Sequence, residues 1–388
     1  MSRGPGIHDL EIHPGIRDLL RLRSVPGVGD HTLARLVRKF GSASVALDVS
    51  DGAFAEVAGW KAARARRTGP DPTGGDVRDI DGEIDRVFQR VEELGLRVVG
   101  LGSPGYPTAL EDLHDPPPVL FLRGRPEILE RPSVAIVGSR KATAYGRRSA
   151  EVLGAALARA GIVVTSGLAL GVDAAAHRGA LQAGGEALGV LGSGVDVPCP
   201  RANARLFREL ARDHLLVSEF LPGTDAAPHH FPQRNRIMAA LSSAVIVVEA
   251  AARSGALITV DHALDLGREV LAVPGKVDSA TSRGTNAMIR DGATIVCDLE
   301  EVVEVLALAL PAVFGDRSAR GPSEAPGIPR GLSGPAARIW EALGEGDRTA
   351  DELAESVELA SGRVLALLSS LEANGWVEAR PGMRYSRR

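Results

Sequence analysis

Seven short runs of valine, isoleucine and leucine, separated by helix-length segments, occupy residues 134–297 of this chain. The runs are Val134–Val137, Ile162–Thr165, Leu188–Leu191, Leu215–Ser218, Val245–Val248, Val270–Val273 and Ile295–Cys297. The segments between them include Ala144–Arg159, Asp173–Ala183, Arg201–Arg212 and Ala256–Leu266. Nearly continuous apolar strands that alternate with helices predict a mostly parallel sheet covered on both faces. We therefore expect an α/β chain with a central, doubly wound Rossmann-like domain.

The length of the chain leaves room for further domains on either side of this sheet. A chain of 388 residues predicts two or three domains. We expect a small helical domain and linker at 1–75, the Rossmann-like domain at 76–310, a flexible linker at 311–334 and a winged-helix domain at 335–388.

The C-terminal domain is predicted from three helical patterns followed by a short hairpin. Thr349-Ala350-Asp351-Glu352 has the pattern of a capping box at the start of the second helix. The third helix of a winged helix that reads DNA enters the major groove. Arg363 is the only cation between Ser361 and Ala373. This favours a protein-interaction or packing module over a reader of DNA sequence.

The N-terminal part contains the pattern of a helix-hairpin-helix turn. Val25-Pro26-Gly27-Val28-Gly29 precedes the amphipathic stretch Thr32–Phe40. Small residues in such a turn let backbone N–H groups approach a phosphate at the start of a helix. A purely structural turn between two packed helices is an equal alternative.

Charge and cysteine content exclude several classes of protein. The net charge of −4 argues against a surface coated in positive charge, so any nucleic-acid site must be local. One such window exists, because five cations and no acids lie between Arg131 and Arg148. A solvated helix face is the alternative for this window. Cys199 and Cys297 are the only cysteines, and neither a disulfide framework, a metal site nor a cofactor is indicated.

No apolar run is long enough to span a membrane, and no charged-then-apolar leader begins the sequence. We therefore expect a cytoplasmic protein without a membrane partner.

Small residues follow the predicted strands at the edge where α/β proteins bind ligands. They are Gly138-Ser139-Arg140, Ser166-Gly167, Gly192-Ser193-Gly194, Ser254-Gly255 and Gly275-Lys276. Each turn could face an anion with backbone N–H groups, although glycine at such turns is also ordinary packing chemistry. Several turns side by side could hold successive phosphates of a polymer, since neighbouring strands lie about 4.8 Å apart.

Mononucleotide motifs are missing. Gly192-Ser193-Gly194 lacks the third glycine of a dinucleotide fingerprint, and Gly275-Lys276 is followed by Val277 rather than Ser or Thr.

The densest polar cluster is His229–Met238, which contains Phe231, Arg234, Asn235 and Arg236. Its arginines can bind phosphate or lock neighbouring loops, and its phenylalanine offers a face on which a base can stack.

The sequence resembles the bacterial DprA/Smf family of DNA-processing proteins throughout the central region. The matching residues are Tyr106-Pro107, Asp115–Leu120, Val134–Arg140, Tyr145-Gly146, Ser166–Asp173 with His177, Phe231–Arg236, Val248–Ala250, Ser254-Gly255 with Thr259, Val273–Gly275 and Gly284–Asn286. Val197-Pro198-Cys199-Pro200 departs from the family's usual Tyr-Pro, which removes an aromatic contact.

This resemblance implies a non-enzymatic protein that binds single-stranded DNA, forms a homodimer through the Rossmann-like domain, and loads the recombinase RecA in natural transformation or DNA repair. It implies DNA contacts at Gly138, Ser139 and Arg140, around Phe231 and at the turns near Ser254 and Asn286. For the dimer, Asn286–Ala293 offers Met288 and Ile289. The expected DNA site comprises Gly138, Ser139, Arg140, Ser166, Gly167, Phe231, Arg234, Asn235, Arg236, Ser254, Gly255, Lys276 and Asn286.

The sharpest hypothesis concerns one loop. We expect Arg140, together with the N–H groups of Gly138 and Ser139, to hold a DNA phosphate. Two other functions compete with this one. A Rossmann-like nucleotide hydrolase could use Glu219, Glu249 or Asp173 as acid or base, although the Gly-Gly-x-Gly-Thr loop of that class is missing. A transcription regulator would act through the winged helix.

Overall fold

The computed structural model divides the chain into two compact units, Met1–Ser318 and Ala319–Arg388. It describes residues 14–68, 79–297, 302–311, 313–314, 335–343, 347–357, 359–373, 376–380 and 384–387. Most of the expected linker at 311–334 lies outside the described residues. Each unit is described by itself below.

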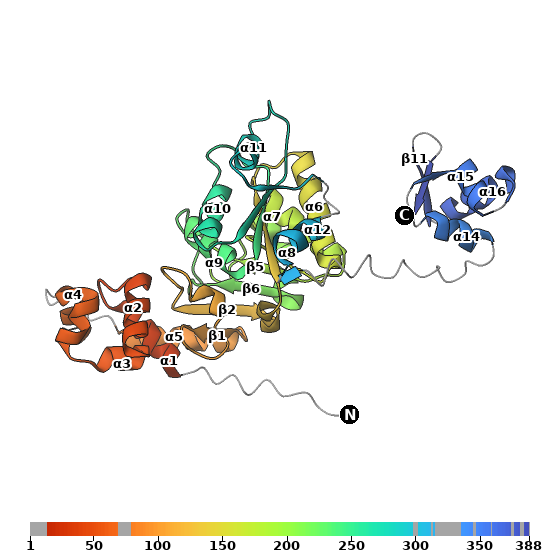
Figure 1. The fold of residues 1–388 in the computed structure, drawn as a ribbon. Coiled ribbons are helices and arrows are strands. Elements are labelled where there is room, and N and C mark those ends of the chain that lie inside the picture. The colour runs from red at the N-terminus through yellow and green to blue at the C-terminus, as the bar shows by residue number, and fades with distance from the viewer. Residues whose placement is uncertain are drawn as a thin grey trace, which may run out of the picture. The chain divides into compact units, whose positions relative to one another are not determined.

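A nine-stranded sheet forms the centre of the larger unit (Figure 1). Its strands are β1 (Arg97–Gly100), β2 (Val119–Gly124), β3 (Ser133–Gly138), β4 (Val163–Ser166), β5 (Ala187–Val190), β6 (Leu215–Ser218), β7 (Ala244–Val248), β8 (Glu269–Ala272) and β9 (Thr294–Ile295). Their order in the sheet is β1-β2-β6-β5-β4-β3-β7-β8-β9. The strands β3 to β9 are parallel, whereas β1 and β2 extend one edge in antiparallel pairing. The expected doubly wound fold is therefore confirmed.

Helices cover both faces of the sheet (Figure 1). On one face lie α6 (Ala144–Arg159), α7 (Val172–Gln182), α8 (Ala204–Asp213) and α12 (Val302–Ala309); on the other lie α9 (His230–Leu241) and α10 (Ala256–Asp265), with α11 (Arg283–Arg290) after β8. Val134 and Ile136 of β3 pack in the core with α6 and α7, whereas Ala135 and Val137 pack with α9. Because successive side chains of a strand point to opposite faces, a central apolar strand supplies both cores.

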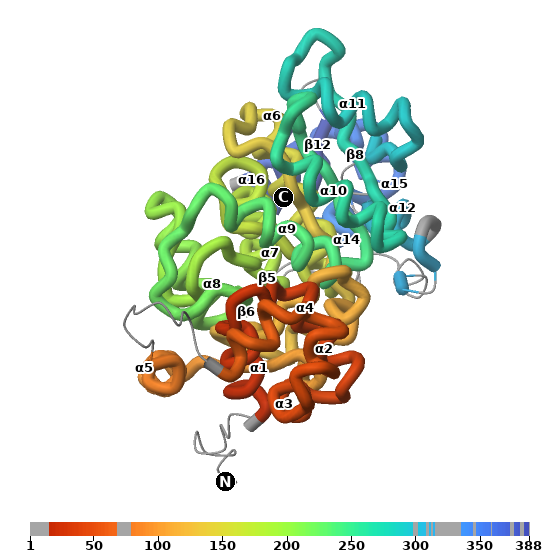
Figure 2. The backbone as a smooth tube through the Cα atoms, turned by 90° about the vertical axis from the view of Figure 1, so that its left-hand side faces the viewer, coloured from red at the N-terminus to blue at the C-terminus, as the bar shows by residue number. Residues whose placement is uncertain are grey.

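Four helices at the N-terminus and a fifth after residue 78 pack beside β1 and β2. They are α1 (Pro14–Ser24), α2 (Asp30–Phe40), α3 (Ala43–Asp48), α4 (Asp51–Thr68) and α5 (Ile80–Glu93). In both Figure 1 and Figure 2 these helices gather at one end of the larger unit. Ile16 and Leu19 of α1 share a core with Ile84 of α5 and Phe121 of β2. The sequence boundary at 75 thus falls between two helices of one core.

The core reaches beyond Leu310, where the sequence placed the end of the central domain. Phe314 is fully buried in the cluster that contains Val302 and Leu306 of α12. Among the described residues, no helix combines the length and apolar character that crossing a bilayer requires.

The smaller unit has the elements of a winged helix. They are α14 (Pro335–Ala342), β10 (Arg348–Thr349), α15 (Ala350–Ser356), α16 (Ser361–Ala373), β11 (Val377–Arg380) and β12 (Arg384–Arg387), with strand order β10-β12-β11. The capping box is confirmed, because Thr349 Oγ1 accepts from the Glu352 N–H at 3.2 Å and Glu352 Oε2 accepts from the Thr349 N–H at 2.7 Å. Its core is formed by Trp340, Leu353, Leu368 and other apolar side chains of all three helices.

Candidate functional site

A cleft of about 620 Å³ lies at the carboxyl edge of the sheet. Strand β3 has β4 on one side and β7 on the other, so the chain connections leave this point in opposite directions. Open α/β sheets bind their ligands at such a switch point. The cleft is lined by Val137–Lys141, Ala169, Asp173, Pro228, Phe231, Pro232, Arg234, Asn235, Met238, Ala251, Ser254–Ala256, Ile258 and Thr259.

The loop after β3 is held by two close backbone approaches that only glycine permits. A Cβ on Gly138 would lie 2.0 Å from the carbonyl oxygen of Val248. A Cβ on Gly171, whose φ is +80°, would lie 2.2 Å from the carbonyl oxygen of Ser139. The loop is therefore wedged between β7 and the start of α7, which fixes the position of the exposed Arg140 that follows.

Glu249, directly after β7, holds the same loop through hydrogen bonds. Its φ of +54° is unusual for a residue with a side chain. The buried carboxylate accepts hydrogen bonds from the N–H of Thr143 at 2.8 Å and from its hydroxyl at 2.5 Å, while the Glu249 carbonyl accepts from the Ser139 N–H at 2.8 Å. These bonds tie the end of β7 to the start of α6. Backbone strain of this kind concentrates at functional sites.

One donor of the phosphate hypothesis already has a hydrogen-bond acceptor within the protein. The N–H of Ser139 was expected to face the ligand, but it is already donated to Glu249. The hydroxyl of Ser139 accepts from the N–H of Lys141 at 3.1 Å. Among the described residues, the N–H of Arg140 has no hydrogen-bond partner and is a donor that remains in this loop.

A cation and an aromatic ring meet at the mouth of the cleft. The guanidinium of Arg140 lies 4.5 Å from the centre of the Phe231 ring. Arg140 comes from the loop after β3 and Phe231 from the first turn of α9, so the pair joins two walls of the cleft. Lys141 adds a second exposed cation. A cation beside an aromatic face can bind phosphate and a stacked base together.

Arg234 lies deep in the cleft and braces the sheet. Its Nη1 donates to the carbonyl oxygens of Gly167, at 3.0 Å, and of Val190, so it links the ends of β4 and β5. Burial lowers the pKa of Arg234 to about 10, and the nearby Asp173 opposes this shift. Arg234 is therefore still charged at neutral pH. It contributes positive potential from beneath the exposed pair.

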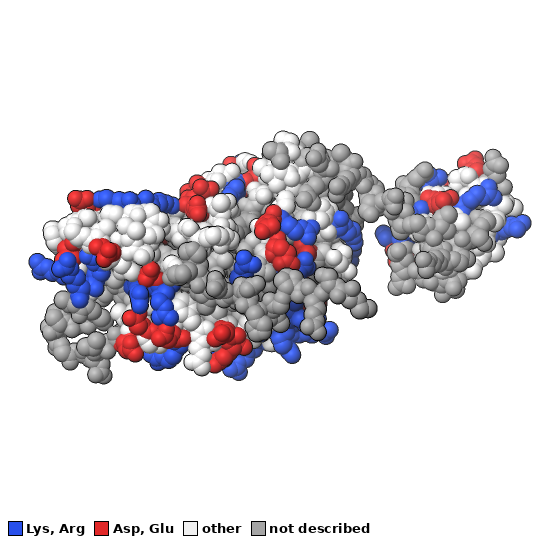
Figure 3. All heavy atoms as spheres, turned by 90° about the horizontal axis from the view of Figure 1, so that it is seen from below, with Lys and Arg blue, Asp and Glu red and all other residues white. Residues whose placement is uncertain are grey.

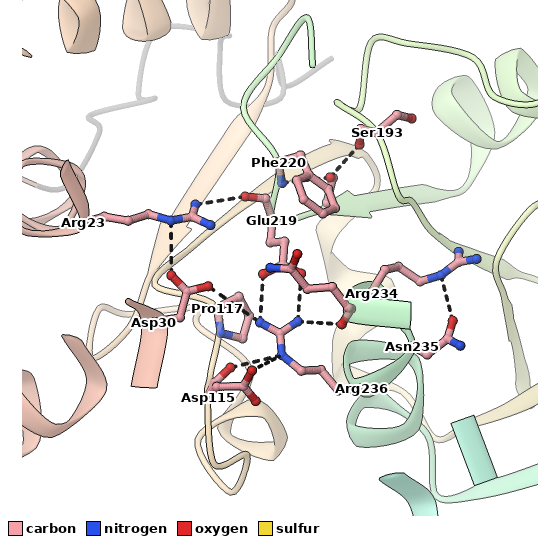
Figure 4. Close-up of polar contacts among 12 residues, drawn as sticks. Arg23, Asp30, Asp115, Pro117, Ser193, Glu219, Phe220, Arg234, Asn235 and Arg236 are labelled. Carbon is pink, nitrogen blue, oxygen red and sulfur yellow. Dashed lines mark hydrogen bonds and ion pairs between the residues drawn. The ribbon is translucent and has the colours of Figure 1, made fainter. Parts of the chain in front are cut away.

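Two residues of α9, Arg234 and Arg236, point in opposite directions (Figure 4). Arg236 is buried and forms a bidentate pair with the buried Glu219, at 2.7 and 2.8 Å. It also donates to the carbonyl oxygen of Asp115 at 3.1 Å and lies 3.9 Å from the carboxylate of Asp30. Arg236 therefore joins the sheet to the N-terminal helices. Arg236 does not line the cleft, so the structure gives no support to the expectation that it binds DNA.

The other expected site residues divide between the cleft and its supports. Asn235 donates to the Gly255 carbonyl at 3.3 Å and accepts from Arg234, which connects α9 to the Ser254-Gly255 turn. Ser166 is fully buried, and its hydroxyl donates to the Ile136 carbonyl at 2.6 Å. Its side chain therefore stabilises the sheet and is not available to contact a ligand in the cleft.

Like Ser166 and Arg236, three further expected residues do not line the cleft directly. Gly167 is buried, and a Cβ there would lie 2.3 Å from the Arg234 guanidinium. Asn286 makes two hydrogen bonds to Gly275, at 3.0 and 3.1 Å, so it shapes the turn after β8. Lys276 is exposed in that turn but outside the cleft lining.

Sequence reasoning missed the full role of Thr259 and Asp173. The buried Thr259 lines the cleft with a hydroxyl that has no hydrogen-bond partner among the described residues. Its spacing from Ser254-Gly255 was the signal that could have placed it. Asp173 accepts from the N–H groups of Gly167 and Ala169 at 3.1 and 3.3 Å, and burial raises its pKa while Arg234 opposes the rise.

The carboxylates that a hydrolase would need are all occupied. Glu219 is paired with Arg236, Glu249 with Thr143, and Asp173 with two backbone N–H groups. In the described part of the chain, no cluster of three or more His, Cys, Asp or Glu could hold a metal ion. Toward the cleft, the geometry supplies hydrogen-bond donors and cations such as Arg140 and Lys141.

A family described as DNA recombination-mediator protein A matches residues 97–307, and the DprA winged helix domain matches residues 323–383. The first match covers more than half of the chain. The chain belongs to the DprA/Smf family. DNA processing protein DprA of Streptococcus pneumoniae is 43% identical over 242 residues, which are 59% of this chain and 85% of that protein. Protein Smf of Synechocystis is 35% identical, covering 74% of this chain and 79% of that protein.

Solved structures of DprA proteins have the same fold. The structure of DNA processing protein A from Streptococcus pneumoniae superposes with a TM-score of 0.65 at 33% identity, over 74% of this chain and 97% of that chain. A structure concerned with the single-stranded DNA binding mode of the Helicobacter pylori protein gives a TM-score of 0.51 at 28% identity, over 55% of this chain and 96% of that chain. The resemblance recognised in the sequence is thus confirmed.

The structural role of Arg236 can be tested by unfolding. Replacing Arg236 with Met leaves Glu219 as an unpaired buried charge, which should lower the free energy of unfolding by about 3–5 kcal/mol in urea. The double variant Arg236→Met/Glu219→Leu should recover much of this loss. An Arg236→Met variant as stable as the wild type would contradict the assignment.

Proposed function

We propose that this DprA/Smf protein binds single-stranded DNA in the cleft at the carboxyl edge of the sheet, through its backbone phosphates. The observation that carries the proposal is the exposed Arg140 over the ring of Phe231, at the end of a loop that Gly138, Gly171 and Glu249 hold rigidly. A guanidinium fixed in this way is organised for a phosphate before the ligand arrives.

Single-stranded rather than double-stranded DNA suits this cleft because an unpaired strand exposes the faces of its bases. Phe231 is partly exposed and offers a stacking surface beside a cation, a combination that binds unpaired strands without sequence preference. The Helicobacter pylori relative, which has this fold, is described as binding single-stranded DNA, and this supports the same ligand class. The chemistry requires no catalytic step, and we propose a binding protein rather than an enzyme.

Replacing Arg140 with Ala should weaken the binding of poly-dT and of mixed-sequence strands to the same extent, since phosphate contacts carry no base information. The slope of log K against log salt should fall by roughly 0.7, the value for one lost single-strand contact. Arg140→Lys should keep the slope but lose affinity, because a lysine cannot stack as a planar group on Phe231. Fluorescence anisotropy over a range of salt concentrations measures both quantities.

Arg159 provides a matched control, because it is an exposed cation at the opposite end of α6. Arg159→Ala should bind like the wild type. If Arg140→Ala lowered only the melting temperature, while the folded protein kept its affinity and salt slope, Arg140 would be a structural brace and the proposal would fail.

We further propose a homodimer formed by the central domain, as the family resemblance implies. A groove of about 500 Å³ lies between α10 and α11, lined by apolar residues that include Leu257, Val260, Leu264 and Met288. Leu264, one of the lining residues, is 60% exposed, which is unusual for a leucine. Met288 is one of the residues that the sequence offered for the interface.

The dimer can be tested by sedimentation of the full chain. Leu264→Lys should shift the protein to monomer, because it places a charge in the apolar contact. Val277→Lys changes an exposed apolar residue outside the groove and should leave the dimer intact. A wild-type chain that sediments as a monomer at micromolar concentration would contradict the proposal.

By the same resemblance, we propose that the protein acts in the cytoplasm and loads RecA onto the bound strand, in natural transformation or DNA repair. Assembly of fluorescent RecA on single-stranded DNA should be faster when the protein is present, and Arg140→Ala should remove the acceleration. Equal acceleration by the wild type and by Arg140→Ala would separate RecA loading from the cleft and contradict this step.

A further inference from the structure

The N-terminal helices contain the same turn twice, 32 residues apart. Val25-Pro26-Gly27-Val28 in the first hairpin corresponds to Val57-Ala58-Gly59-Trp60 within α4. Gly27 has φ of +90° and Gly59 has φ of +83°. At Gly59 the path of α4 breaks, so Asp51–Ala58 and Trp60–Thr68 are two helices joined by a hairpin. The helix-hairpin-helix pattern expected from the sequence is therefore present as a tandem pair.

The two hairpins lie against each other. A Cβ built on Gly27 would lie 3.6 Å from the Cβ of Ala62, so the first turn contacts the helix that follows the second turn. Leu22 and Phe54, which occupy equivalent positions before the two turns, are both fully buried. The pair therefore forms one body with one core, and its surface residues keep fixed positions relative to one another.

The copies differ at the exposed position after the repeated glycine. Val28 of the first hairpin is buried, whereas Trp60 of the second is 61% exposed. Lys61 stands next to Trp60, where the first copy has Gly29, and Lys61 and Arg64 are both exposed. A large exposed aromatic residue is not needed for the fold, since the equivalent valine is sufficient in the other copy.

Positive charge gathers on this part of the chain. Between Val57 and Arg67 there are four cations and no acids. Arg66 is committed to the structure, because it pairs with Asp51 at 2.9 Å and lies 4.5 Å from the centre of the Phe54 ring. Figure 3 shows Lys and Arg side chains gathered at the left-hand end of the molecule, the end at which Figure 1 places α4.

The helix after the first hairpin contacts α9, which also lines the cleft. This helix lines the cleft with Phe231 and Arg234, and its Arg236 lies 3.9 Å from Asp30, the first residue of the helix after the first hairpin. Figure 4 shows the same network, in which Arg23 at the end of α1 contacts Asp30 and the Glu219 carbonyl. One packed body therefore presents both the cleft and the hairpin pair.

We propose that Trp60, Lys61 and Arg64 form a second binding surface for single-stranded DNA, which takes up the strand where it extends beyond the cleft. The proposal rests on the cleft binding single-stranded DNA. An exposed indole and two neighbouring cations match an unpaired base and its flanking phosphates, and their positive charge complements the anionic strand. The surface lengthens the binding site without adding any sequence preference.

The test is a length series of oligo-dT, starting at about four nucleotides, measured with the full chain. Trp60→Ala should leave the affinity for the shortest bound oligonucleotide unchanged and weaken the long ones at least about fivefold, the low end for the loss of one stacked base. Trp60→Phe should retain most of the affinity, whereas Trp60→Leu, which is apolar but cannot stack, should behave like Trp60→Ala.

The cations are tested in the same series. Lys61→Ala/Arg64→Ala should lower the salt slope for long strands by roughly 0.7 per cation. Arg159→Ala serves as the control and should change neither the affinity nor the salt slope for short or long strands.

Three results would overturn this inference: unchanged binding of long strands by Trp60→Ala, an equal loss for short and long strands, or a loss confined to duplex DNA. A failure of the proposal that the cleft binds single-stranded DNA would give a different result. In that case the wild-type and Arg140→Ala proteins would bind the shortest oligonucleotides equally.

Discussion

Strand β3 lies between β4 and β7, and the position of the cleft depends on this single feature of the strand order. Chain connections leave β3 and β7 toward opposite faces of the sheet, so no helix crosses the gap above their carboxyl ends. The loop after β3 enters this gap and is held there by glycine contacts with Val248 and Ser139 and by the carboxylate of Glu249. The backbone geometry of this loop places Arg140 at the cleft, where its guanidinium lies over the ring of Phe231.

Helix α9 connects this cleft to the rest of the larger unit. Arg234 points toward the sheet edge and ties β4 to β5, while Arg236, two residues later, pairs with Glu219 on the opposite side. Burial alone would lower the pKa of Arg236, but the hydrogen bonds and charge of Glu219, with Asp115 and Asp30, raise it instead. The helix therefore contacts both the N-terminal helices and the wall of the cleft.

The sequence was sufficient for the parallel strands and the loops that follow them, because central strands are apolar on both faces and their boundaries are marked by glycine. The strands β1 and β2 and the helix α5 were not predicted, since they pack against neighbours distant in the sequence, such as Ile16 and Leu19. The pattern Arg234-Asn235-Arg236 also could not show which arginine faces the cleft. The answer depends on Glu219, which lies beside Arg236 only once the chain has folded. The second hairpin was missed because Trp60 and Lys61 replace the apolar residue and glycine of the first.

The most direct measurement is a crystal structure of this protein with a short oligo-dT strand. The account predicts a phosphate oxygen within hydrogen-bond distance of the Arg140 guanidinium and its backbone N–H, with a base beside the ring of Phe231. A strand bound elsewhere on the molecule, with Arg140 still resting on Phe231 and no phosphate in the cleft, would contradict it.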